Sequence, residues 1–228
     1  MIEESRWALR ADAAYFEVLM RLLATRSLPD LVAVYFGGAD VLGHRFWRYA
    51  FPDQYRDRPT HAEIKALGHT ISGYYRVLDS MIGSILAALP AEANVFVVSD
   101  HGMRAIRRSR RFDRALPSGA HQGAPPAFFA AMGPDITRAT IRPVASGERP
   151  AASVFDVAPT VLALLGLPAS EDMPGRVLEE ILADGVVIPA RIASYTPHGW
   201  RPPAPQLARP KAAEQERLMQ LRSLGYLQ

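Results

Sequence analysis

The most regular pattern in the sequence is a helical repeat of apolar residues in two long segments. In residues 3–24 the apolar positions recur at intervals of three, four and seven, which places them on one helical face: Leu9, Phe16, Leu19, Met20 and Leu23. A second stripe fills residues 60–89, where Thr60 and Glu63 form a T-x-x-E capping box and Pro90 ends the pattern. Both segments are therefore predicted to be helices.

Three short apolar runs predict strands, at residues 31–36 (LVAVYF), 95–99 (VFVVS) and 127–132 (AFFAAM). The first run does not alternate polar with apolar side chains, which is typical of a central strand in a parallel sheet. A strand, a long helix and a second strand in this order favour a right-handed βαβ crossover. The predicted fold class is α/β, a three-layer α/β/α arrangement with a mostly parallel sheet.

Helical signals return after residue 155. Asp156 is a candidate N-cap, Pro159 falls in the first turn, and Gly166 follows an apolar VLALL stretch at the expected stop. A shorter helix is predicted at residues 176–182.

The C-terminal part of the chain differs in composition. Residues 188–210 contain six prolines, which exclude regular structure and predict an extended arm over the surface. An amphipathic helix is predicted at residues 214–224. We therefore expect residues 1–187 to belong to one domain, and residues 188–228 to form the Pro-rich arm and a terminal helix.

Composition restricts the chemistry available. The 228 residues are 49% hydrophobic and contain no cysteine, so a core is expected, whereas disulfides and thiolate metal sites are excluded. The N-terminus has acids where a signal peptide needs basic residues, and no apolar run approaches the ~18 residues that span a bilayer. A soluble and, as encoded, cytoplasmic protein without a transmembrane segment is expected. The net charge is +3, and six arginines lie between residues 104 and 114.

Carboxylates and imidazoles lie close to the ends of the predicted strands. Asp40 and His44 follow the first strand, Asp100 and His101 end the second, and His121 shortly precedes the third. In open parallel sheets, the loops at the carboxyl ends of strands bind ligands. Asp and His together suit a divalent cation. Taken singly, Asp40 could cap a short helix and His121 could be a solvated loop residue, but a buried Asp beside a His needs a partner.

Other polar and aromatic groups carry weaker signals. His61, His69 and His198 fit structural or solvated positions, although His198 could belong to a loop that covers a site. The arginines after His101 fit a solvated loop better than an anion-attracting one. Three aromatic residues could form either ordinary packing or an apolar wall for a nucleoside or lipid: Phe46, Trp47 and Tyr49.

Together these motifs resemble a known family. The order D-x-x-x-H, S-D-H-G-M, G-x-H-x-G before F-x-A-x-G-P, and F-D-V-A-P-T-V-L-A-L-L-G-L-P is similar to the alkaline phosphatase superfamily. Within it, the phrase Y-F-G-G-A-D-V-L-G-H-R-F-W resembles the type I phosphodiesterase and nucleotide pyrophosphatase group. The resemblance covers about residues 28–182, and it implies an alkaline-phosphatase-like catalytic domain that is incomplete on its N-terminal side.

The resemblance implies a metal-dependent phosphoester hydrolase with a phosphoester substrate. Asp40, His44 and His121 would bind one metal, and Asp100 and His101 would bind the other. Mixed His and Asp ligands favour two zinc ions, with manganese as the alternative. The family's Thr or Ser nucleophile and a further Asp belong far upstream of Asp40, so the catalytic nucleophile is unknown and is expected to lie outside this chain. An upstream half or a partner chain is then expected, and the isolated chain should be inactive or weak.

Two alternative functions stay open from the sequence alone. A phosphoglycerate mutase or phosphopentomutase of the same superfamily carries similar D-x-x-x-H and D-H-G motifs, although the R-F-W-R-Y continuation disfavours it. A non-catalytic fragment, or a protein that binds through its basic loop, is the second alternative. Nucleic acid is not expected as a partner.

Overall fold

The computed structural model contains both helices and strands, which agrees with an α/β chain. It describes residues 2–25, 27–106, 117–138 and 152–196, together with Gln215 and Leu218. The chain divides into two compact units. The first contains residues 1–89, 101–128 and 208–228, and the second contains residues 90–100 and 129–207.

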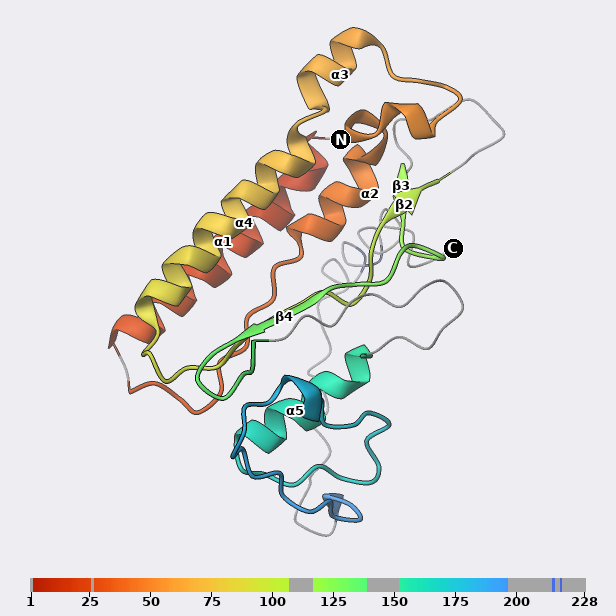
Figure 1. The fold of residues 1–228 in the computed structure, drawn as a ribbon. Helices are drawn as coiled ribbons and strands as arrows, with labels where there is room; N and C mark the ends of the chain where they lie inside the picture. The colour runs from red at the N-terminus through yellow and green to blue at the C-terminus, as the bar shows by residue number, and fades with distance from the viewer. Residues whose placement is uncertain are drawn as a thin grey trace. The chain divides into compact units, whose positions relative to one another are not determined.

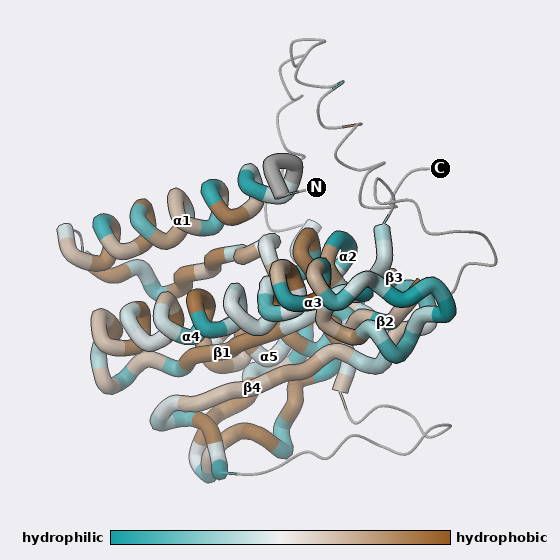
Figure 2. The backbone as a smooth tube through the Cα atoms, turned by 90° about the horizontal axis from the view of Figure 1, so that it is seen from above, coloured by the Kyte–Doolittle hydropathy of each residue, from teal (hydrophilic) through white to brown (hydrophobic). Residues whose placement is uncertain are grey.

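The first unit is mainly helical. Its helices are α1 (Ile2–Thr25), α2 (Gly38–Ala50), α3 (His61–Leu67) and α4 (Thr70–Ala88), with a short 3-10 turn η1 (Pro52–Gln54). Figure 1 shows α1 and α4 side by side, with α2 against them. Hydrophobic and hydrophilic residues alternate along α1 and α4 (Figure 2). The helix predicted at residues 3–24 is confirmed. Phe16, Leu19, Met20 and Leu23 of the predicted stripe are buried or partly buried, whereas Leu9 is 39% exposed.

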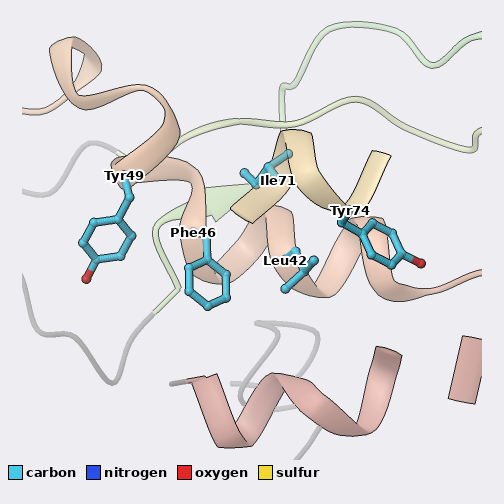
Figure 3. Packing of buried hydrophobic residues seen from close by; sticks show 5 residues of the cluster. All are labelled: Leu42, Phe46, Tyr49, Ile71 and Tyr74. Atoms are coloured by element: carbon cyan, nitrogen blue, oxygen red, sulfur yellow. The ribbon is translucent and has the colours of Figure 1, made fainter. Parts of the chain in front are cut away.

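The core of this unit lies between α2 and α4. Leu42, Phe46 and Tyr49 of α2 pack with Ile71 and Tyr74 of α4 (Figure 3). Phe46 is 2% exposed and Tyr49 is 1% exposed. Both aromatic rings therefore serve packing. This shared core holds α2 against α4.

The predicted long helix at residues 60–89 is two helices. The capping box of Thr60 and Glu63 is present at the start of α3. Gly68 and His69 separate α3 from α4. Gly68 keeps helical backbone angles, whereas His69, with φ −95° and ψ 3°, leaves the helical region. The break is short and apolar residues recur on both sides of it, so the periodicity predicts a single helix.

The described strands differ from the predicted mostly parallel sheet. β1 (Val95–Val98) pairs antiparallel with β4 (Phe129–Met132) in the second unit, and β2 (Arg104–Ala105) pairs antiparallel with β3 (Gly119–Ala120) in the first. The predicted strands at 95–99 and 127–132 are therefore present as β1 and β4. The predicted βαβ crossover from residues 31–36 to residues 95–99 is not formed, because residues 31–36 are not a strand.

Residues 31–36 were predicted as a central strand, and this prediction is wrong for the structure. They lie outside any strand, and Leu31 and Tyr35 are 56% and 72% exposed. Their apolar character on both faces suits burial within a sheet, and the described strands do not provide that burial.

The second unit is organised around α5 (Val157–Leu164), which follows a 3-10 turn, η2 (Val154–Asp156). Gly166 has a φ of +69° and ends the helix with a Schellman pair, because Leu167 N–H donates to Leu162 and Gly166 N–H to Ala163. Pro159 lies in the first turn, as predicted.

The helix predicted at residues 176–182 reduces to a 3-10 turn, η3 (Glu179–Ile181). The backbone N–H of Arg176 donates to the Asp156 carboxylate, and that of Leu178 donates to the Thr160 hydroxyl. These bonds to the α5 region hold residues 176–178 outside a helix.

Part of the Pro-rich arm is described. Residues 188–196 run alongside residues 169–171, where Ile192 N–H donates to Ala169 and its carbonyl accepts from Glu171. This agrees with an extended arm. The arginine-dense stretch beyond residue 106, His198 and nearly all of the predicted helix at 214–224 lie outside the described residues. Over the described part of the chain, none of the helices is both long and apolar enough to cross a membrane.

Candidate metal centre

Four of the five predicted site residues come together in the first unit. Asp40 and His44 lie on α2, His101 precedes β2, and His121 follows β3 directly. The convergence arises because β2 pairs with β3, and β3 packs against α2.

A close backbone approach places His44 against β3. A Cβ atom at Gly119 would lie 2.4 Å from the Gly43 carbonyl oxygen, and one at Gly43 would lie 2.8 Å from the Met103 side chain. Position 119 therefore requires glycine, because the close contact is with backbone. At position 43 the close atom is the terminal methyl of Met103, which can move aside.

His44 is 2% exposed and its ring is fixed by this contact. Its Nδ1 lies 2.7 Å from the Gly119 carbonyl oxygen, which makes Nδ1 the protonated donor and leaves Nε2 as the nitrogen with a lone pair. A histidine that donates Nδ1–H to a backbone carbonyl is the arrangement found in metal-ligating imidazoles.

Ser118, next to Gly119, holds the backbone of α2 at the same level. Its N–H donates to the His44 carbonyl at 2.6 Å, and its hydroxyl oxygen accepts from Arg48 N–H at 3.3 Å. The same hydroxyl lies 3.2 Å from the carbonyl oxygens of His44 and Arg45. Ser118 therefore contacts both backbone groups that an α-helix would join between residues 44 and 48.

Tyr55 supports Ser118 from the other side. Its hydroxyl donates to the Ser118 carbonyl at 2.6 Å. Burial raises the pKa of Tyr55 to about 12, against the opposing effects of the Ser118 hydrogen bond and the Arg48 charge. The phenol therefore stays neutral and able to donate well into the alkaline range.

Two of the imidazoles face one oxygen of Asp40. His44 Nε2 lies 3.3 Å and His101 Nε2 lies 3.8 Å from Asp40 Oδ1. The His101 Nδ1 lies 3.0 Å from the Gly102 carbonyl oxygen, so this ring also directs Nε2 toward the carboxylate. The His121 ring centroid lies 5.4 Å from that of His44 and 4.6 Å from that of His101.

The donor atoms of this cluster fit a divalent cation in type and in burial. Asp40 Oδ1, His44 Nε2 and His121 Nε2 are each buried from solvent. Carboxylate oxygen and imidazole nitrogen are the donors of zinc sites that lack cysteine. No group of three or more such side chains within the described ranges is arranged around a common ion position, however. The two predicted ligand sets therefore stay predictions.

Asp100 has an exposed side chain and belongs to the second unit, whereas His101 is partly buried in the first. Gly102 allows a close backbone approach, since a Cβ there would lie 2.5 Å from the Pro125 carbonyl oxygen.

The sequence did not identify Asp12, which organises the start of α2. Asp12 is 2% exposed on α1, and its carboxylate accepts hydrogen bonds from Gly37 N–H at 2.9 Å and Gly38 N–H at 2.8 Å. The Tyr74 hydroxyl of α4 donates to the same carboxylate. Burial, followed by the Asp12 hydrogen bond, raises the pKa of Tyr74 above its ordinary value. The sequence carries no signal of this role, because the backbone partners of Asp12 lie 25 and 26 residues further along the chain.

The remaining candidates do not join the cluster. Trp47 packs on Phe51 with ring centroids 4.4 Å apart, and its indole N–H donates to Gln54. His61 is exposed at the first position of α3, and His69 is exposed at the junction between α3 and α4.

Comparison with known proteins supplies the family. The family model for type I phosphodiesterase / nucleotide pyrophosphatase matches residues 4–166, which is more than two thirds of the chain. The match includes most of α1 and all of α2, the four clustered residues and α5. Neither the curated proteins nor the solved structures gave a match. On the strength of the family match, the chain belongs to the type I phosphodiesterase / nucleotide pyrophosphatase family.

Proposed function

We propose that the chain carries the metal-binding part of a phosphoester hydrolase that acts on phosphodiesters or pyrophosphates. The observation that carries the proposal is the direction of two imidazoles, whose Nε2 atoms face the same Asp40 oxygen at 3.3 and 3.8 Å. Membership of the family adds the substrate class.

We assign Asp40, His44 and His121 to one metal and Asp100 with His101 to the other, with zinc preferred and manganese as the alternative. The buried mixture of oxygen and nitrogen donors supports this choice of metal. Two divalent metals in such a site stabilise the entering and the leaving oxygen of a phosphoester displacement.

The chain's own residues contribute binding and orientation. Asp40 supplies negative charge to the site, and the Gly119 carbonyl keeps the His44 proton on Nδ1 so that Nε2 can bind. The Gly102 carbonyl orients His101 in the same way. Because Asp40 and His44 share one rigid helix, their separation is set by the fold of α2 and not by a loop.

The nucleophile is assigned to a Thr or Ser of another polypeptide segment, an upstream half or a partner chain that would complete the catalytic domain proposed for residues 1–187. Ser118 is an unsuitable nucleophile because its hydroxyl contacts three backbone groups of α2. A missing nucleophile costs several orders of magnitude in rate. The isolated chain should therefore hydrolyse bis-p-nitrophenyl phosphate at or near the background rate.

Phosphate binding tests the proposal without requiring turnover. Inorganic phosphate, titrated calorimetrically, should bind to the zinc-loaded chain and not to the metal-free chain. His44→Ala should abolish this binding, whereas His69→Ala changes an exposed histidine outside the cluster and should preserve it. Equal phosphate binding with and without zinc would contradict the proposal. Robust zinc-dependent turnover by the isolated chain would contradict only the assignment of the nucleophile.

A further inference from the structure

The N-terminus of α2 is held by a side chain from another helix. Its own N-cap residue, Gly37, has no side chain to offer, and no side-chain cap within α2 is formed. Asp12 takes this role from 25 residues away, accepting one backbone N–H on each carboxylate oxygen. The backbone donors of a helix start are thereby satisfied, and a carboxylate faces the positive end of the helix dipole.

Tyr74 and Gly38 make this arrangement specific. The Tyr74 hydroxyl donates to Asp12 Oδ2, which joins α1, α2 and α4 at one point. A Cβ at Gly38 would lie 2.5 Å from the Tyr74 ring and 2.6 Å from Asp12 Oδ2. The site therefore excludes any side chain at position 38, and Asp12 is nearly completely buried there.

The first turn of α2 also carries Asp40. A change in where α2 starts, or in its tilt, would move the Asp40 carboxylate relative to His101, which is on a different element. The middle of α2 is held separately, by Ser118 and Gly119 at His44. These contacts do not reach the N-terminus of α2. Asp12 fixes that end of the helix.

We infer that Asp12 is a positioning residue for the candidate metal centre, with Tyr74 as its support, because it fixes the start of α2 and with it the Asp40 carboxylate. The inference rests on the proposed function in one respect, since it takes Asp40 and His44 as ligands. Asp12 itself contacts backbone groups and Tyr74, and acts on the metal only through α2.

The chain offers a matched control in Asp156. This aspartate is 6% exposed, and its carboxylate also accepts two backbone N–H groups, from Ser153 at 2.7 Å and Arg176 at 2.9 Å. It belongs to the second unit. The substitutions Asp12→Asn and Asp156→Asn therefore remove one acceptor oxygen from equivalent buried caps, one beside the candidate ligands and one remote from them in sequence and unit.

Calorimetric titration with Zn²⁺ alone tests the inference. We expect Asp12→Asn to weaken Zn²⁺ affinity by about tenfold, as loss of an orienting partner does in metal sites. Asp156→Asn should change the affinity by less than about twofold, at a similar loss of thermal stability. Equal affinities in the two variants would overturn the inference. Should Asp12→Asn fail to fold, Tyr74→Phe removes only the supporting hydroxyl, and unchanged affinity in that variant would overturn it equally.

A second measurement separates this inference from the proposed function. His44 Nε2 lies 3.3 Å from Asp40 Oδ1, so the imidazole ¹H–¹⁵N signals of His44 report the position of the Asp40 carboxylate. In the metal-free chain these signals should shift in Asp12→Asn and stay in place in Asp156→Asn. If the wild-type chain binds no Zn²⁺, the metal centre is wrong, but the comparison of these signals still decides whether Asp12 positions Asp40. Identical signals in all three proteins would overturn the positioning role.

Discussion

α2 and α5 each have a buried aspartate near their start, but the two aspartates act differently, since Asp156 makes no side-chain cap to α5 itself. At α5, Ser153 and Asp156 form a capping box in the preceding 3-10 turn, within three residues of each other. At α2, the acceptor comes from α1 and is 25 residues distant. None of the predicted metal ligands lies on α5, whereas α2, with its remote cap, carries Asp40 and His44.

This difference shows what a long-range cap adds. A local capping box stabilises its own helix wherever that helix lies. A cap supplied by another element also fixes the position of the helix relative to that element. For α2, that fixed position includes Asp40 and His44.

The largest difference between α2 and α5 should be in the unfolding free energy that is lost when a packed side chain is truncated. Phe46 is 2% exposed in the core between α2 and α4, so Phe46→Ala should cost about 3–5 kcal/mol of unfolding free energy. Leu162 of α5 is only half-buried, and Leu162→Ala should cost roughly half as much. Urea denaturation of both variants measures this. Equal losses would show that the two helices are equally embedded.

The caps should give the next largest effects. Gly38→Ala places a methyl group 2.5 Å from Tyr74 and disturbs the Asp12 contact, with an expected loss of about 1–3 kcal/mol. Ser153→Ala removes a local cap and should cost about 1 kcal/mol. A larger loss for Ser153→Ala than for Gly38→Ala in thermal denaturation would reverse the comparison.

Local signals made the α5 region predictable from sequence. Pro159 and Gly166 act on neighbouring residues, so their identity indicates the structure directly. Asp156 stands at the predicted N-cap position, but its side chain does not cap α5 and instead accepts backbone N–H groups of Ser153 and Arg176. The cap of α2 could not be predicted in this way, because an aspartate in the middle of α1 shows no sign of its partners at residues 37 and 38. The predicted central strand at residues 31–36 was wrong for a related reason. An apolar run indicates a sequence that suits a strand, but it does not indicate whether neighbouring strands are available to pair with it.

The pH dependence should differ between the two regions at alkaline pH. The pKa of Tyr55, beside α2, is raised to about 12, so its contribution to stability is complete below pH 10 and is lost as the pH rises toward 12. Urea midpoints measured from pH 8 to 11 should fall more steeply for the wild type than for Tyr55→Phe. Tyr75→Phe, which removes an exposed hydroxyl, is the control. An identical slope for wild type and Tyr55→Phe would remove Tyr55 from the account.

The smallest effect is expected at the surface near α5. Arg176 donates to both Glu180 oxygens, at 2.5 and 2.8 Å, and this hydrogen bond lowers the Glu180 pKa. Its stabilisation is present above the ordinary Glu range and is lost as the pH falls through the lowered pKa. Because the Glu180 side chain is 39% exposed, Glu180→Gln should cost only about 0.2–1 kcal/mol at pH 7. A loss above this range would mean that the pair is structurally central.

The sequence predicts which residues form the candidate site better than it predicts how their side chains are arranged. Asp40, His44, His101 and His121 were identified because acids and imidazoles at the ends of apolar segments are unusual, and these four residues do cluster. Which residues share a metal depends on ring directions, and those are set by the Gly119 and Gly102 carbonyls. Sequence spacing alone contains no information about such contacts.

The central claim is that this cluster binds a divalent metal, and the most direct test is the stoichiometry of Zn²⁺ binding by isothermal titration calorimetry. The site of Asp40, His44 and His121 retains three predicted protein ligands, so about one strong equivalent per chain is expected. His44→Ala should abolish that equivalent, and His69→Ala should preserve it. Absence of strong Zn²⁺ binding in the wild type, or binding that survives in His44→Ala, would contradict the account.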